Sequence, residues 1–254
     1  MTRAAVTFPG KVGDILWSLP TAREIAKEYG PVDFYVMEHF AGICELIEHQ
    51  PYINKCIGLE DWTVDGNKSL QDISPPALAQ EYEKVYNLGY IEYPSQSLIN
   101  ISPLVAGVSL SEPVLPFINV EPKGQYDIVF GFSVYIQPIK EEFISKVISS
   151  VLQKFPNATW IDASDMPWKE FAEYTSGGKI YVGDKTGMHV IAHGLNKRYI
   201  IETEGNSDRR SHIFCCPYDT QNTIRMDLPN HYSIIDYHQV YSEMIELCLG
   251  VIYA

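Results

Sequence analysis

Two short segments of the 254-residue sequence carry residues whose types and spacing suit chemistry on a bound ligand. The first segment, GKVGD at residues 10–14, follows an apolar run and precedes a helical pattern. A glycine-bearing turn between a strand and a helix presents backbone N–H groups and the positive helix end at the carboxyl edge of a sheet. The turn therefore predicts one wall of a ligand cleft, built from Gly10, Lys11 and Gly13. Its spacing matches neither the dinucleotide fingerprint nor a P-loop.

Asp14, which closes this segment, has two interpretations. As the N-cap of the following helix, its carboxylate would accept hydrogen bonds from the free N–H groups of the first turn. At the mouth of a ligand cleft, the same carboxylate would act as a general base toward a substrate hydroxyl. The two interpretations are compatible, and Trp17, three residues further on, would face the same cleft.

The second segment, GDKTGMHVIAHG at residues 183–194, also lies between an apolar run and a helical pattern. A threonine hydroxyl and the N–H groups of a helix N-terminus suit a diphosphate, and Lys185 would add positive charge. His189 and His193 would share a helix face, but no HExxH pattern supports a metal site. We therefore expect a phosphate-binding turn without a metal. Its candidate residues are Asp184, Lys185, Thr186, Gly187, Met188 and His189.

Strands alternate with helices along the chain, which predicts parallel sheets covered on both faces. In the first half, the patterns predict strands at 4–8, 32–37, 57–59 and 84–88, and helices at 15–29 and 40–49. In the second half, they predict strands at 126–132, 158–163, 179–183 and 198–202, and helices at 140–155, 166–175, 187–197 and 237–249.

The stretch 109–123 contains Pro113, Pro116 and Pro122 and has no long apolar period, which is typical of a boundary between domains. The βαβ plan occurs once on each side of it. We therefore expect an α/β protein of two Rossmann-like domains, residues 1–120 and 121–254, facing each other across a cleft.

Together the two segments resemble the glycosyltransferases of the heptosyltransferase family. In that family an early strand leads into a Gly-Asp turn and a helix with a proline about six residues on, and Gly13, Asp14 and Pro20 match these positions. The family's later motif is D-[ST]-G-x-x-H. Residues 183–189 are similar to this motif. The spacing from Asp184 to His189 is the same as in the motif, but Thr186-Gly187 stand one position later than its Ser/Thr-Gly pair.

The resemblance implies the GT-B fold and an inverting, metal-independent hexosyl or heptosyl transfer. The donor would be a nucleotide-diphosphate sugar, the acceptor a hydroxyl of a saccharide or glycolipid, and no cofactor would be needed. Asp14 would be the general base on the acceptor side, in the first domain. The second domain would bind the donor diphosphate through Thr186, Gly187 and the helix N-terminus, with Lys140 or Lys185, and His189 would contact the donor.

The basic turn that the family carries after the first strand of its second domain is poorly matched. Only Ser133 and Lys140 stand there as candidates for donor binding.

The formal net charge of −13 argues against nucleic acid as the main partner, because phosphate contacts need a basic face. The longest basic cluster is Arg209-Arg210. No apolar run is long enough for a signal peptide or a transmembrane segment, so we expect a cytoplasmic protein. The five cysteines, an odd number, are expected to be reduced thiols.

Two other functions fit the same pattern. A non-catalytic nucleotide-sugar or carbohydrate-binding protein could keep the scaffold, and the short chain and the shifted second motif favour it. A different α/β enzyme, such as an epimerase or a phosphate-transfer protein, could share only the architecture, because fold does not fix function. Nucleotide binding without sugar transfer or donor hydrolysis would indicate the binding protein. A bound cofactor or metal would indicate the different enzyme.

Overall fold

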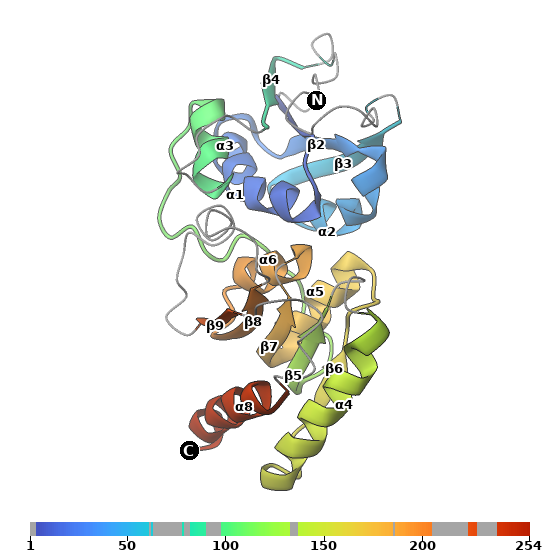
Figure 1. Ribbon diagram of the computed structural model, residues 1–254. Helices are drawn as coiled ribbons and strands as arrows, with labels where there is room; N and C mark the ends of the chain where they lie inside the picture. The colour runs from blue at the N-terminus through green and yellow to red at the C-terminus, as the bar shows by residue number, and fades with distance from the viewer. Residues whose placement is uncertain are drawn as a thin grey trace. The chain divides into compact units, whose positions relative to one another are not determined.

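A computed structural model describes residues 4–60, 62, 78, 82–89, 98–132, 137–184, 186–204, 223–227 and 238–254. The chain divides between Val120 and Glu121 into two compact units, and each unit has its own parallel sheet (Figure 1). Two candidate site residues, Ser133 and Lys185, lie outside the described residues, and so does the Arg209-Arg210 pair.

The sheet of the first unit has the strand order β3-β2-β1-β4, with all neighbours parallel. Its strands are β1 (Ala4–Phe8), β2 (Val32–Met37), β3 (Ile53–Leu59) and β4 (Lys84–Asn87). Its helices are α1 (Val12–Tyr29), the 3₁₀ helix η1 (Glu38–Ile43), α2 (Cys44–Glu48) and α3 (Leu98–Ala106). All four strands that the sequence predicts here are confirmed. Both β1 and β2 are buried along their whole length, as expected for strands covered on both faces.

Helix α1 packs through the apolar face that the sequence predicts. Its buried apolar residues include Ile15, Leu16, Leu19, Ala22 and Ile25. The helix ends at Gly30, whose φ of 79° lies in the left-handed region that glycine adopts without a Cβ clash.

The helix predicted at residues 40–49 is a 3₁₀ helix followed by a short α-helix, so its predicted form is wrong. The chain passes close to β3 here: a Cβ on Gly58 would come within 2.6 Å of Ala41 Cβ. The tighter 3₁₀ turn is common where a helix starts, and here it accommodates this close approach.

The second unit has the strand order β6-β5-β7-β8-β9, again all parallel. Its strands are β5 (Tyr126–Gly131), β6 (Trp160–Asp162), β7 (Gly178–Asp184), β8 (Tyr199–Glu204) and β9 (Thr223–Asp227). Its helices are α4 (Gln137–Lys154), α5 (Trp168–Gly177), α6 (Gly187–Gly194) and α8 (His238–Tyr253). Every strand and helix that the sequence predicts in this half is found, with ends shifted by a few residues.

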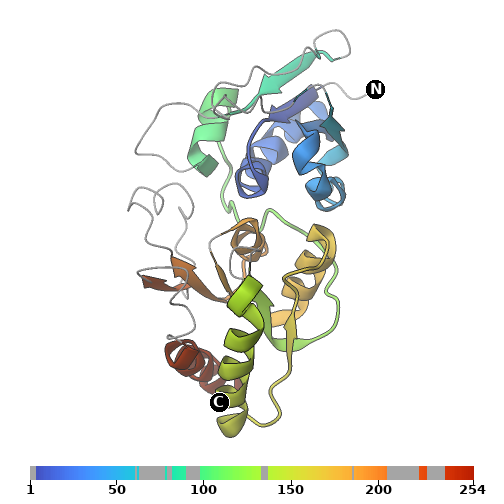
Figure 2. The ribbon, with the colours of Figure 1, turned by 45° about the vertical axis from the view of Figure 1, so that its right-hand side comes forward.

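Helices α4 and α8 lie side by side and close the main core of the second unit, as Figures 1 and 2 show. Alternate residues of the strands point into this core, including Ile128 and Phe130 of β5 and Ile180 and Val182 of β7. Helices α4 and α8 contribute Phe143, Val147, Val151, Tyr241, Ile245 and Leu249. Each large apolar side chain buried in this way contributes roughly 1.5–3 kcal/mol.

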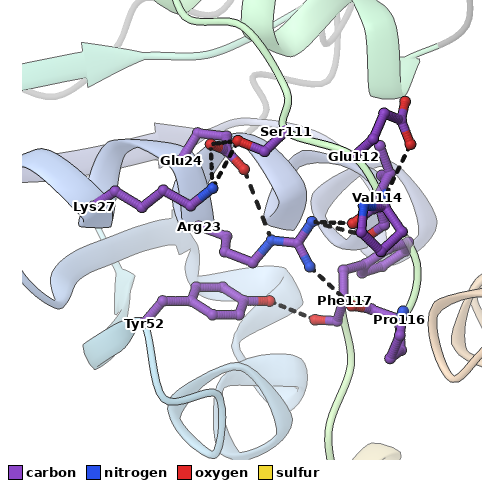
Figure 3. A network of polar contacts seen from close by, with 10 residues as sticks. Arg23, Glu24, Lys27, Tyr52, Ser111, Glu112, Val114, Pro116 and Phe117 are labelled. Atoms are coloured by element: carbon purple, nitrogen blue, oxygen red, sulfur yellow. Dashed lines mark hydrogen bonds and ion pairs between the residues drawn. The ribbon is translucent and has the colours of Figure 1, made fainter.

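Residues 109–120 form an extended segment, which we call the strap, packed on the first unit. The Arg23 guanidinium of α1 donates hydrogen bonds to the carbonyls of Pro116 (2.8 Å) and Val114 (2.9 Å), as Figure 3 shows. The Tyr52 hydroxyl donates to the Phe117 carbonyl at 2.5 Å. The proline-rich stretch is therefore an ordered part of the first unit up to its end, where the chain enters the second unit.

Two elements have no counterpart in the sequence prediction, helix α3 and strand β9. Helix α3 contains Pro103, which argues against a helix. Strand β9, TIRMD, is a mixed polar edge strand without a continuous apolar run. None of the helices that the structure describes combines the length and the apolar character needed to cross a membrane.

Candidate functional site

The GKVGD turn lies at the place in the first sheet where the strand order reverses. Strand β1 pairs with β2 on one side and with β4 on the other. In open parallel sheets, ligands bind outside the carboxyl ends of the strands at such a switch point. The ends of β1 and β4 stay together, because Leu88 N donates to Thr7 O at 2.9 Å and Gly89 lies against Pro9.

Asp14 lies in the first turn of α1, and the N-cap interpretation of Asp14 is wrong. The helix begins at Val12 with Lys11 as its N-cap, and the Lys11 side chain makes no capping hydrogen bond. The first turn closes when Ile15 N donates to Lys11 O at 2.9 Å, so the helix starts before Asp14. Asp14 is half-buried in this turn, where the helix dipole favours a negative charge. A carboxylate at a switch point suits proton abstraction from a ligand hydroxyl.

The other predicted residues of this turn differ in their exposure. Lys11 is exposed, Gly13 is half-buried and Gly10 is buried. Trp17 is buried, and its ring centroid lies 5.7 Å from that of Phe117 in the strap. Its indole is therefore part of the core of the first unit, where it fixes the strap against α1.

The second predicted segment also lies at a switch point, between β5 and β7. These strands pair in parallel, with Gly131 opposite Gly183, and β6 and β8 lie on the outer sides. A Cβ on Gly183 would lie 2.2 Å from Gly131 O, so a residue with a side chain does not fit here unless the neighbouring strand moves.

Thr186 is the N-cap of α6. Its hydroxyl oxygen accepts a hydrogen bond from Met188 N at 3.4 Å, and its hydroxyl donates to Asp184 Oδ1 at 3.2 Å. Thr186 and Gly187 are half-buried and Met188 is buried. N–H groups at the start of a helix, with a hydroxyl beside them, are a common binding arrangement for phosphate.

Four buried ionisable side chains lie behind this turn. They are Asp184 of β7, His189 and His193 of α6, and Glu202 of β8. His193 Nε2 lies 3.5 Å from Glu202 Oε2, and the rings of His189 and His193 meet edge to face at 5.7 Å. Only 3% of His189 is exposed, so His189 supports α6 from the inside.

The carboxylates of this cluster also affect the pKa values of two neighbouring tyrosines. Burial raises the pKa of Tyr181 and of Tyr241 well above its ordinary value, and the nearby carboxylates of Asp184 and Glu202 raise it further. Sequence reasoning missed Glu202, although an acidic residue that directly follows the apolar run YII of a buried strand is a usable signal.

Lys140, a predicted donor-binding residue, is only 3% exposed and is held by two carboxylates. Its Nζ lies 2.6 Å from Asp165 Oδ2 and 3.4 Å from Asp162 Oδ2. Burial by itself lowers the pKa of Lys140, but these two carboxylates outweigh burial, and the net pKa lies above its ordinary value. The Lys140 ammonium is therefore charged, and the two aspartates already neutralise it. A bound phosphate would have to share the ammonium with them. Sequence reasoning missed both aspartates.

The described residues offer no group of three or more His, Cys, Asp or Glu side chains that could hold a metal ion. In particular, the histidines of α6 and the acids beside them do not form such a set.

The chain is similar in structure to solved heptosyltransferases. ADP-heptose LPS heptosyltransferase II of E. coli matches with a TM-score of 0.65 and 14% identity, over 99% of this chain and 100% of that one. E. coli heptosyltransferase WaaC, solved with ADP-2-deoxy-2-fluoro heptose, matches with a TM-score of 0.61 and 14% identity, over 95% and 99%. A family 9 glycosyltransferase of Veillonella parvula matches with a TM-score of 0.51 and 12% identity, over 96% and 89%.

No protein-family model matches the sequence, and no curated protein matches it significantly. At these identities the structural likeness shows the fold. The α/β fold of the heptosyltransferases, predicted from the two sequence segments, is confirmed over nearly the whole chain.

Proposed function

We propose that this chain is a glycosyltransferase that moves a sugar from a nucleotide-diphosphate donor to an acceptor hydroxyl, with inversion and without a metal. One observation carries the proposal. Within a fold shared with heptosyltransferases, each unit places one polar turn and one helix N-terminus at the switch point of its own sheet. The turn with Asp14 suits proton abstraction, and the turn with Thr186 and Gly187 suits a diphosphate.

The second unit is the donor side in this proposal. The N–H groups at the start of α6 and the Thr186 hydroxyl would bind the donor diphosphate, as helix N-termini bind phosphate. One solved neighbour, WaaC, is described with ADP and with an ADP-sugar analogue, and this chain would bind a donor of that class at its α6 turn. Lys185 would contribute positive charge, whereas Lys140 would share its charge with Asp162 and Asp165. Asp184 would hold Thr186 in place through its hydrogen bond.

The first unit is the acceptor side. Asp14 would take the proton of the acceptor hydroxyl while the hydroxyl oxygen attacks the anomeric carbon, and the diphosphate would leave from the opposite face. Attack from the opposite face inverts the anomeric centre. The charge on the departing diphosphate would be stabilised by the oriented dipoles of α6 rather than by a cation.

A thermal denaturation series tests the donor site. The protein is melted with ADP, UDP, GDP, CMP and their sugar conjugates, without added metal. A nucleotide at a hundredfold excess over its dissociation constant should stabilise the protein by about 2.7 kcal/mol. The Thr186→Val variant should lose most of the response, whereas Thr186→Ser, which keeps the hydroxyl, should retain it.

If no nucleotide raises the melting midpoint, the α6 turn is not a donor site and the proposal is wrong. If one nucleotide does so, but its sugar conjugate is neither transferred nor hydrolysed, the chain is a nucleotide-sugar-binding protein rather than an enzyme.

A further inference from the structure

Cys44 and Cys56 bring two thiols together on the first unit, outside both switch-point turns. Cys44 is the first residue of α2, and Cys56 lies in the middle of β3. Both are free cysteines in the structure. They are twelve positions apart in the sequence, with no motif spacing to connect them, so the sequence gives no signal that they meet.

The packing of α2 on β3 brings these thiols together. Cys56 N donates a hydrogen bond to Glu48 Oε1 at 2.8 Å, so the end of α2 is fixed at Cys56. Cys44 lies four residues before Glu48 and therefore on the same side of the short helix. Along β3, Cys56 and Gly58 point to one face, and a Cβ on Gly58 would meet Ala41 of η1 within 2.6 Å. That face of β3 is the one that η1 and α2 cover, and Cys44 lies there as a neighbour that perturbs Cys56.

The two thiols differ in a way that gives each a separate role. Cys44 is half-buried, whereas only 7% of Cys56 is exposed. The neighbouring Cys56 thiol lowers the pKa of Cys44, although burial and the carboxylates of Glu48 and Glu38 act in the opposite direction. The neighbouring Cys44 thiol and burial raise the pKa of Cys56. Cys44 is thus the more accessible thiol and the one with the lower pKa, so it is the one that reacts first.

We infer that Cys44 and Cys56 form a reversible dithiol–disulfide site, in which Cys44 reacts first with a small-molecule disulfide and Cys56 then closes an internal disulfide. This inference does not depend on the proposed glycosyl transfer.

With oxidised glutathione as the reagent, the chemistry balances in two steps. The Cys44 thiolate attacks one glutathione sulfur, the glutathione S–S bond breaks, and one glutathione thiolate leaves. Cys56 then gives up its proton to water, and its sulfur attacks the Cys44 sulfur and displaces the second glutathione thiolate. The two protein thiols are oxidised to one disulfide, and one glutathione disulfide is reduced to two thiols that take up the two released protons.

Peptide mapping of the full-length protein tests the inference. The reduced protein is equilibrated with oxidised glutathione, free thiols are alkylated, and the digest is analysed by mass spectrometry without reduction. A Cys44–Cys56 cross-linked peptide should dominate, with an intact mass lower by two hydrogen atoms, and reduction should restore both thiols. Cys248, which is buried and whose pKa burial raises, is the internal control and should stay reduced.

Two variants separate the roles of the thiols. Cys56→Ala should accumulate a stable glutathione adduct on Cys44, because the second thiol is missing, whereas Cys44→Ala should give neither an adduct nor a disulfide. Wild-type protein that keeps both thiols alkylatable, or that stops at the glutathione adduct on Cys44, would overturn the inference. The wild-type map alone decides the question if a variant does not fold.

Discussion

At the scale of single residues, Asp14 combines partial exposure with a place in the first turn of α1 at the switch point of its sheet. We expect Asp14→Asn to lower the rate of sugar transfer by roughly 10²- to 10⁴-fold, because the amide cannot take the acceptor proton. The melting shift with the donor nucleotide should be unchanged. A transfer assay at saturating donor, with the same melting series, checks both.

Glu28→Gln is the matched control, since it makes the same carboxylate-to-amide change at an exposed position of the same helix. It should leave transfer unchanged. An Asp14→Asn variant that keeps more than a tenth of the wild-type rate would show that another group takes the proton.

His189 supports the donor turn from inside the second unit. His189→Ala should weaken donor binding at least tenfold, about 1.4 kcal/mol, because the ring packs against His193 beneath the start of α6. Isothermal titration with the nucleotide found in the melting series measures the loss. His49→Ala, at an exposed histidine of the first unit, is the control and should not change binding. A smaller loss than tenfold counts against any role of His189 at the donor site.

At the scale of elements, the strap depends on one arginine for several of its carbonyl hydrogen bonds. The Arg23 guanidinium donates to the carbonyls of Pro113, Val114 and Pro116. Arg23→Met should lower the free energy of unfolding by about 1–3 kcal/mol, because it leaves carbonyls of a packed segment without their donor. Urea denaturation measures this change.

Arg23→Lys is the informative companion variant. It keeps the positive charge but not the planar fork that reaches several carbonyls, so it should recover only part of the loss. Full recovery by lysine would mean that charge, rather than hydrogen-bond geometry, holds the strap.

Asp127 ties the start of β5 to neighbouring elements and makes the stability of the second unit depend on pH. Its carboxylate accepts hydrogen bonds from Lys179 Nζ at 2.8 Å and from Thr159 N at 2.7 Å. Burial by itself raises the pKa of Asp127, but these hydrogen bonds and one from Tyr253 outweigh burial, and the net pKa lies below its ordinary value.

A carboxylate with a lowered pKa stabilises the folded state when it is ionised. Its contribution is therefore complete well above the unfolded-state pKa of about 3.9 and is lost as the pH falls through the lower, folded-state pKa. We expect Asp127→Asn to be less stable than the wild type by a constant amount between pH 6 and about pH 5. Below about pH 4 the difference should shrink. Urea midpoints across this range check the sign, and a difference that grows in acid would contradict it.

At the scale of the whole molecule, the chain consists of two units, each with its own parallel sheet. A ligand stabilises the elements that it contacts against local opening. The donor nucleotide should therefore slow amide hydrogen exchange in residues 178–194 by up to about a hundredfold at a hundredfold excess over its dissociation constant. Exchange in β1 and β2 should not change.

Adenosine at the same concentration is the control if the donor is an adenine nucleotide, because it lacks the diphosphate that α6 would bind. Protection of residues 4–60 instead of residues 178–194 would reverse the assignment of the donor side.

The sequence by itself determined the local elements and the two polar turns. Apolar runs such as AAVTF and YDIVFGF predict β1 and β5 because strands buried on both faces need continuous apolar side chains. The end of α1 is also predictable from the sequence, because Gly30 adopts the positive φ of the C-cap and Pro31 cannot continue a helix. The resemblance of residues 13–30 and 183–189 to heptosyltransferases gave the fold, because these turns connect a strand to a helix in the order that the fold requires.

Only the tertiary structure decided which side chains meet. The pairing of Lys140 with Asp162 and Asp165, and that of His193 with Glu202, joins residues from different elements, and no spacing in the sequence encodes it. The start of α1 at Val12 places Asp14 in the first turn rather than at the N-cap. The sequence did not show this, because Asp is a preferred N-cap residue. Trp17, Cys44 and Cys56 likewise acquired their neighbours when α1 packed on the strap and α2 packed on β3. Periodicity reports which face of an element is buried, whereas contacts between elements depend on the packing of the whole chain.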